Sequence, residues 1–150
     1  MVDFNNDNIE DLVIGAPGEA PEGGRKSGFV FVFSRYFRSN GFYTEELIPS
    51  QGLDQRTLDA NENGDLFGEA LGAGDFNGDG FDDLAVGAPG EAPGPDSKSG
   101  AAFVFNGTSS GLTPVQELDQ GELDANENGD LFGKALGAGD FNGDGFDDLA

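Results

Sequence analysis

The sequence predicts an all-β protein built from repeated units. Its 150 residues include 26 glycines and 7 prolines, and its apolar residues fall in short runs between clusters of Asp, Asn and Gly. This composition is typical of short strands joined by tight turns. Residues 53–85 and 118–150 also match at all but three positions, which gives a repeat with a step of 65 residues. Such a repeat indicates an architecture in which each unit buries its faces against its neighbours.

The first unit is expected to contribute three strands. Residues 12–14 form a short apolar run that ends at Gly-Ala-Pro-Gly, and residues 28–33 read Gly-Phe-Val-Phe-Val-Phe. The second run is apolar on both faces of a strand, so both faces should be covered. Residues 42–48 alternate like a more exposed outer strand. The connection over residues 34–42 is expected to absorb the extra length of this unit.

The middle unit repeats this order and adds one strand at its start. Residues 70–74 form an inner strand that enters an acidic loop, and residues 83–88 form the next strand, which Gly and Pro end. Residues 101–105 and 114–118 correspond to the second and third strands of the first unit. The last unit is expected to have its inner strand at residues 135–139.

An acidic loop recurs in all three units, with oxygen-bearing side chains at positions one, three, five and nine. Calcium takes about six to eight oxygen ligands at roughly 2.3–2.6 Å, which these side chains and the carbonyl at position seven can supply. Position six is Asn8, Gly80 or Gly145, residue types that tolerate the positive φ of a tight loop. The sequence thus predicts up to three Ca²⁺ ions, one per loop. The expected ligands are Asp3, Asn5, Asp7, Ile9 and Asp11; Asp75, Asn77, Asp79, Phe81 and Asp83; and Asp140, Asn142, Asp144, Phe146 and Asp148.

Two other interpretations of the loop are less favoured. Asp, Asn and Gly also form polar hairpin turns without any metal. Three copies in the same ligand register favour the metal. An EF-hand loop closes with a Glu at position twelve, where this chain has Ile14 or Val86, and a strand rather than a helix follows here. The EF-hand is therefore excluded.

The residues that flank the loop resemble a known repeat. Phe67-Gly68 precedes the loop of residues 75–83, and Gly87-Ala88-Pro89 follows it. In this order they resemble the FG-GAP repeat of the integrin alpha-subunit β-propeller and of related bacterial surface and secreted proteins. The resemblance implies blades of four-stranded antiparallel sheet, with calcium held in the loop between the first and second strands of each blade.

The resemblance also implies an incomplete ring of about two blades, with strands A to D counted from the inside. Residues 1–57 form a partial blade (B to D) with the first calcium loop, and residues 58–122 form a complete blade with the second. Residues 123–150 form a partial blade (A and B) with the third. The chain is then either a fragment of a longer propeller or a self-associating unit. In the second case the strand over residues 134–140 would complete the first blade of another copy.

Charge and composition limit the partners and the chemistry. The formal net charge is −22, from 29 acidic and 7 basic residues, which disfavours nucleic acid as a partner. No apolar run approaches membrane-spanning length, so no membrane insertion is expected. The chain has no His and no Cys, so we predict that this stretch is not an enzyme. Two carboxylates can still suffice for glycoside hydrolysis, which keeps that chemistry formally open.

The function that the resemblance implies is structural calcium binding in a propeller segment. The parent protein would be an extracellular or cell-surface adhesion or ligand-binding protein, although no signal peptide is visible in this stretch. Its ligand, a protein or a glycan, is not identified by the sequence. A lectin-like, carbohydrate-binding propeller and a non-catalytic propeller attached to a secreted hydrolase are the alternatives. The lectin is disfavoured by the absence of Trp and the presence of only 2 Tyr.

Overall fold

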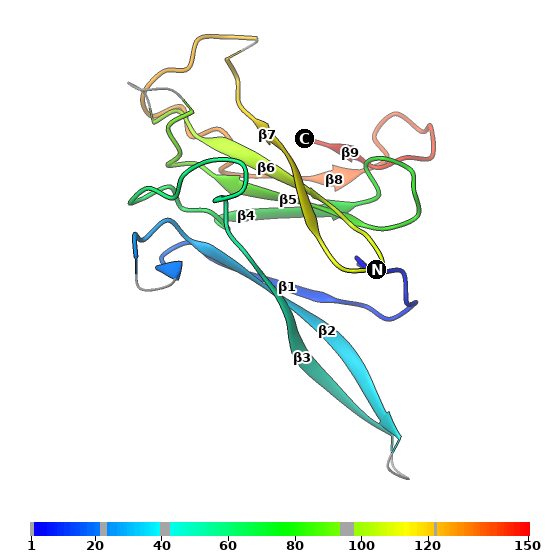
Figure 1. Ribbon diagram of the computed structural model, residues 1–150. Helices are drawn as coiled ribbons and strands as arrows, with labels where there is room; N and C mark the ends of the chain where they lie inside the picture. The colour runs from blue at the N-terminus through cyan, green and yellow to red at the C-terminus, as the bar shows by residue number, and fades with distance from the viewer. Residues whose placement is uncertain (1, 22–23, 40–42, 94–97, 122) are drawn as a thin grey trace.

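The computed structural model describes residues 2–21, 24–39, 43–93, 98–121 and 123–150. Nine β-strands lie in these residues, and they form three antiparallel sheets without a closed barrel (Figure 1). The predicted all-β class with a four-stranded antiparallel blade is therefore confirmed. In the part of the chain that the structure describes, no helix has both the length and the apolar character to cross a membrane.

The strands follow one another within each sheet in sequence order, and neighbouring strands pair antiparallel as hairpins. The first sheet holds three strands, the second four and the third two. The strands are β1 (Leu12–Ala16), β2 (Phe29–Ser39) and β3 (Tyr43–Leu53); β4 (Ala70–Gly74), β5 (Asp83–Ala88), β6 (Ala101–Asn106) and β7 (Thr113–Leu118); and β8 (Ala138–Gly139) and β9 (Asp148–Leu149).

Two elements differ from the sequence prediction. The segment over residues 34–42 was expected to be a connection, but β2 and β3 stay paired from Val30↔Leu53 out to Ser39↔Tyr43. The β-prone residues on both sides let the ladder continue, and the hairpin projects beyond the other strands (Figure 1). Phe42, the expected start of the third strand, lies outside the described residues. The inner strand expected at residues 135–139 is reduced to the two residues of β8.

Neighbouring sheets are joined by main-chain hydrogen bonds at the Phe-Gly signature. Phe67 N donates to Ser27 O of the first sheet's unit at 2.8 Å, and Phe132 N donates to Ser99 O at 2.8 Å. A parallel bridge accompanies each bond, between Gly28 and Phe67 in the first case. The same joint therefore occurs at both boundaries between sheets.

At these joints the glycine of a Phe-Gly segment lies against the glycine of a Gly-Ala-Pro segment. A Cβ added to Gly15 would come closer than 3.0 Å to the carbonyl oxygen of Gly68, and a Cβ added to Gly87 would overlap the carbonyl oxygen of Gly133 in the same way. Gly68 and Gly133 also have positive φ values of 91° and 76°. The Gly of Phe-Gly and the Gly of Gly-Ala-Pro are thus required because two backbones touch where the sheets meet.

The hydrophobic core is anchored by the phenylalanine of the same signature. The Phe67 ring packs 5.6 Å from the ring of Phe103 and 6.1 Å from that of Phe105, measured between centroids. All three residues are at most 1% exposed. Because Phe67 binds the first sheet through its backbone and the second through its ring, it fixes the two sheets relative to each other.

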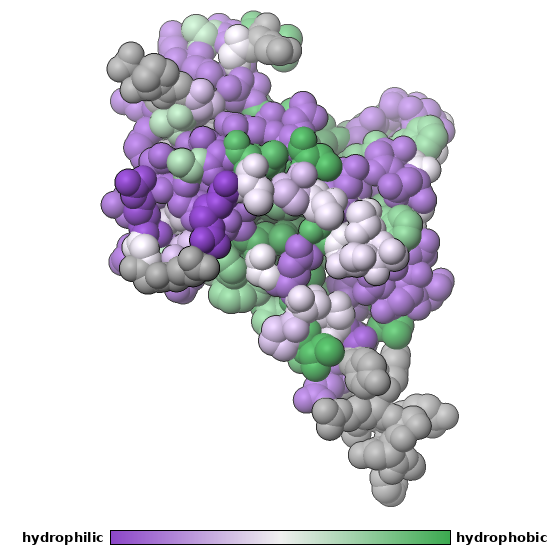
Figure 2. Space-filling view, in the orientation of Figure 1, coloured by the Kyte–Doolittle hydropathy of each residue, from purple (hydrophilic) through white to green (hydrophobic). Residues whose placement is uncertain are grey.

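The first sheet is covered on one face, whereas the middle sheet is largely covered on both. Val30 and Val32 of β2 are buried, but Phe31 between them is 37% exposed and Ile14 beside it is 45% exposed. The expectation that both faces of this strand are covered therefore holds for one face here. Figure 2 shows hydrophilic residues gathered around the loops at the ends of the strands, with paler and apolar residues between them.

Replacing Gly87 with Ala should destabilise the protein by about 1–3 kcal/mol, the usual range for an overpacked site. The new methyl group would displace the backbone of Gly133 and open the second joint. The free energy of unfolding from urea denaturation measures this effect. Gly18→Ala is the matched control, because a Cβ at Gly18 meets nothing within 4 Å. Equal stability of the two variants would contradict the steric account of the joint.

Candidate calcium loops

The carboxylate at position one organises the backbone of each loop. In the second loop Asp75 Oδ1 accepts hydrogen bonds from Gly78 N at 2.7 Å and Asp79 N at 3.1 Å, while Oδ2 accepts one from Gly80 N at 2.9 Å. The third loop repeats all three bonds, and the first loop has two of them. The loop therefore curls around this one side chain.

The side chains at positions three and five also turn toward the backbone of their own loop. Asn77 Oδ1 accepts from Asp79 N at 2.8 Å, so the oxygens of Asn77 and Asp75 converge on one N–H group. Asp79 Oδ1 in turn accepts from Phe81 N at 3.0 Å. Both bonds recur in the first and third loops. The alternate side chains predicted as ligands are thus held on the inner side of the loop.

The carboxylate at position nine closes the loop from the following strand. Asp83 is fully buried at the start of β5, where Oδ2 accepts from Phe76 N at 3.1 Å and Oδ1 from Gly107 N at 2.9 Å. Burial raises the pKa of Asp83, and the nearby charges of Asp79 and Asp75 add to this effect. A bound cation would relieve the repulsion among these carboxylates.

Positive φ angles occur at two positions of every loop. Position six has them as the sequence predicted, because only Gly or Asn tolerates this conformation readily. Position four has them too, which the sequence analysis did not foresee. The values are 55° for Asn6 and 65° for Asn8, 74° for Gly78 and 88° for Gly80, and 80° for Gly143 and 94° for Gly145.

The model of the FG-GAP repeat family matches residues 1–33 and 67–105, which include the first two loops and the Gly-Ala-Pro segments after them. The chain carries FG-GAP repeats. The resemblance to this family expected from Phe67-Gly68 and its neighbours is therefore confirmed. The Phe-Gly and Gly-Ala-Pro segments that give the family its name are the segments whose backbones touch at the joints between the sheets.

This chain is similar to parts of integrin alpha proteins and of a phospholipase D. Integrin alpha-PS5 of Drosophila melanogaster is 39% identical over 153 residues, which cover 99% of this chain and 14% of the integrin. Phosphatidylinositol-glycan-specific phospholipase D of Mus musculus is 37% identical over 117 residues, or 73% of this chain and 12% of the enzyme. The chain thus spans about one seventh or less of the length of these relatives.

The FG-GAP loops offer a donor set that fits a hard cation. Each contains carboxylate and amide oxygens and no nitrogen or sulfur ligand type, which is the chemistry calcium prefers. The carboxylates of a loop are nevertheless not drawn fully together. Among the described residues, three acidic side chains with oxygens all within 4.8 Å of one another occur at Asp59, Glu62 and Glu91, outside the loops. Hydrogen bonds within each loop fix its backbone turn and the direction of its side chains. A bound ion would draw the carboxylates closer together.

An acidic residue that the sequence analysis assigned no role links neighbouring FG-GAP loops. Asp82 Oδ2 accepts from Asp3 N at 2.6 Å, and Asp147 Oδ2 accepts from Asp75 N at 3.1 Å. The backbone adds Asp82 N to Asp3 O at 3.3 Å and Asp147 N to Asp75 O at 3.2 Å. Position eight of the second and third loops thus clasps position one of the loop before it. The signal for it was the Asp that stands directly before position nine in both long copies, Asp82 before Asp83 and Asp147 before Asp148.

The clasp is tested by comparing Asp147→Ala with Asp147→Asn in the presence of a chelator. Both changes remove the charge, but Asn keeps an oxygen that can accept from Asp75 N. The Ala variant should be less stable by about 1 kcal/mol, the typical net value of one hydrogen bond. The measurement is urea denaturation. If the two variants unfold at the same urea concentration, the clasp does not contribute.

Proposed function

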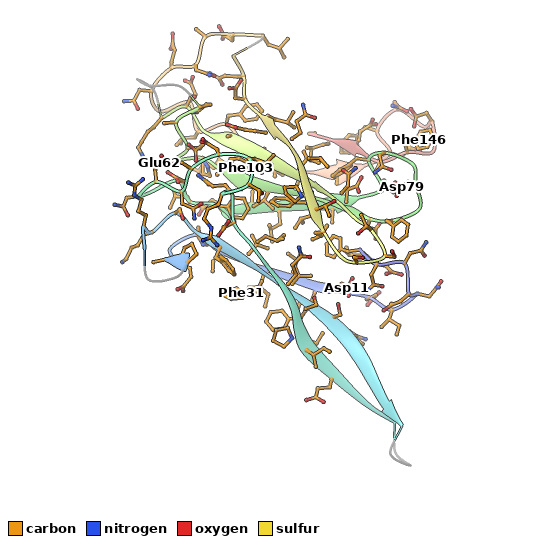
Figure 3. All side chains as sticks on the ribbon, viewed as in Figure 1. Asp11, Phe31, Glu62, Asp79, Phe103 and Phe146 are labelled. Atoms are coloured by element: carbon orange, nitrogen blue, oxygen red, sulfur yellow. The ribbon has the colours of Figure 1, made fainter. Side chains whose placement is uncertain are left out.

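We propose that this chain is a calcium-stabilised FG-GAP propeller segment of an extracellular or cell-surface protein that binds a ligand. The observation that carries the proposal is the recurrence of one arrangement of oxygen-bearing side chains in three loops. The loops also share one end of the strands, where Asp11, Asp79 and Phe146 lie in Figure 3. The expected ligands are the side chains at positions one, three, five and nine and the carbonyl oxygen at position seven.

The role proposed for calcium is structural. Each ion would join the end of one strand to the start of the next, because positions one and nine flank β4 and β5 in the complete blade. Three ions would offset about six of the 22 excess negative charges. An ion surrounded by the oxygen ligands of its loop leaves little room for an activated water molecule. We therefore assign the ions no catalytic step.

The proposed setting rests on the similarity to integrin alpha subunits and to a phospholipase D. The integrin similarity supports an adhesion or ligand-binding propeller at the cell surface, with a protein or glycan as the bound partner. The similarity to phosphatidylinositol-glycan-specific phospholipase D supports a second candidate, a non-catalytic propeller that accompanies a hydrolase. In both cases this stretch would supply a scaffold stabilised by calcium.

Calcium titration by calorimetry tests the proposal. Asp79→Ala should bind one ion fewer than the unmodified chain, because it removes the position-five ligand of one loop and leaves the other two loops intact. Glu69→Lys is the matched control, since Glu69 is an exposed acidic residue outside the loops and the next unit has Lys134 at the same position. It should bind as many ions as the unmodified chain.

Thermal unfolding gives an independent measurement. Excess chelator should lower the melting temperature, because calcium binds the folded loops and not the unfolded chain. An unchanged melting temperature in chelator, together with an unchanged ion count in Asp79→Ala, would overturn the calcium role. The fold assignment does not depend on this result.

A further inference from the structure

A second group of acidic side chains lies at the opposite end of the blade from the calcium loops. Asp59 and Glu62 belong to the connection between β3 and β4, and Glu91 follows β5. We call these three residues the connector cluster. Figure 3 shows Glu62 and Asp79 at opposite ends of the β4–β7 sheet. The cluster is therefore separate from the FG-GAP loops.

The geometry of the connector cluster suits one cation. Each of its three carboxylates offers an oxygen, and these oxygens all lie within 4.8 Å of one another. Two ligands on opposite sides of a calcium ion stand about 4.6–5.2 Å apart, since each bond is roughly 2.3–2.6 Å long. Three carboxylates at such distances repel one another unless protons or a cation intervene.

Buried oxygens without hydrogen-bond partners surround the cluster, which is a separate observation. Gln55 and Asp65 are fully buried, and Gln55 Oε1 and Asp65 Oδ1 have no partner. Both side chains lie against the cluster, because Gln55 Nε2 donates to Glu91 and Asp65 Oδ2 accepts from Glu62 N at 2.6 Å. Asn61 Oδ1 and Glu62 Oε2 are also buried and unpartnered. Buried polar atoms normally have partners, so the unpaired oxygens of Gln55, Glu62 and Asp65 point to a positive ligand. Asn61 does not add to this, because its counterpart in the last unit, Asn126, has an unpaired buried oxygen too.

Two basic side chains among the described residues lie near the cluster. Arg25 Nη1 lies 3.9 Å from Glu62 Oε1, whereas the other oxygen of this carboxylate, Oε2, is the buried one without a partner. Lys98 Nζ donates to the main-chain oxygens of Asn63 and Gly90, each at 3.2 Å. Asp65 and Glu91 are fully buried, so their charges are costly unless a positive group pairs with them.

The other units provide an internal comparison. In the first unit Glu19 occupies the position of Glu91, has the same backbone bonds and is exposed. In the last unit Gln120 is the counterpart of Gln55, and its Nε2 donates to Ala125 O and to Asp130. Asp130, however, is exposed. A complete cluster forms where the connecting segment meets the second residue after Gly-Ala-Pro, Glu91, in the middle unit. Its burial thus depends on both parts.

We propose that Asp59, Glu62 and Glu91 bind a divalent cation of the calcium type, with Gln55 Oε1, Asn61 Oδ1 and Asp65 Oδ1 as further oxygen donors. The site would tie the segment that enters the blade to the turn after β5, at the end that the FG-GAP loops do not reach. The inference does not rest on the function of those loops, because it uses different residues.

Calcium titration by calorimetry, with CaCl₂ as the probe, tests the site through Glu91→Gln. This variant keeps the size of the side chain and an oxygen that can accept from Gln55, and it should bind one ion fewer than the unmodified chain. Glu19→Gln is the matched control, and it should bind the full number. Asp59→Asn, at a partly exposed residue, gives the same test if Glu91→Gln does not fold. A full ion count in Glu91→Gln or in Asp59→Asn overturns the proposal.

Melting temperatures separate cation binding from a packing role. In chelator Glu91→Gln should melt at the same temperature as the unmodified chain or higher, because it removes a buried charge. In saturating calcium it should melt lower, because it cannot hold the ion as well. The same decrease in both conditions would mean that Glu91 only packs, and would overturn the proposal. Asp79→Ala reports on the loops alone, so failure of the loops and failure of this site are told apart.

Discussion

The main-chain contact between Gly15 and Gly68, repeated between Gly87 and Gly133, is the constraint on which the rest of the structure depends. It brings neighbouring sheets so close that no side chain fits between them at that point. This closeness allows Phe67 to bond with one sheet and fill the core of the next. It also brings successive loops within hydrogen-bonding reach of each other, so that position eight of one clasps position one of another.

Charge is separated from the core in this arrangement. The joints use uncharged main-chain atoms and a phenylalanine ring, whereas many of the carboxylates are concentrated at the two ends of the strands. A chain with a net charge of −22 is destabilised by its own repulsion. Cations held at both ends would therefore act where the repulsion is strongest.

Local patterns in the sequence predicted most of the fold and most of the loop geometry. Strand positions, the loop register and the positive φ at position six each depend on a few consecutive residues, so they could be predicted. The β2–β3 extension could not, because pairing of Arg35 with Leu47 depends on cross-strand partners rather than on a turn signal. The connector cluster could not either, since Asp59 and Glu91 are brought together by the packing of two turns distant in sequence.

The joints also bear on how such a chain can arise. A contact made of main-chain atoms and glycine is present in any copy of the unit, so a tandem duplication of the coding segment supplies its own interface at once. The two long copies differ at residues 56, 57 and 69 of the first, and all three side chains are exposed. Divergence has thus begun at the solvent-facing positions, and the number of units can change without a new interface having to evolve.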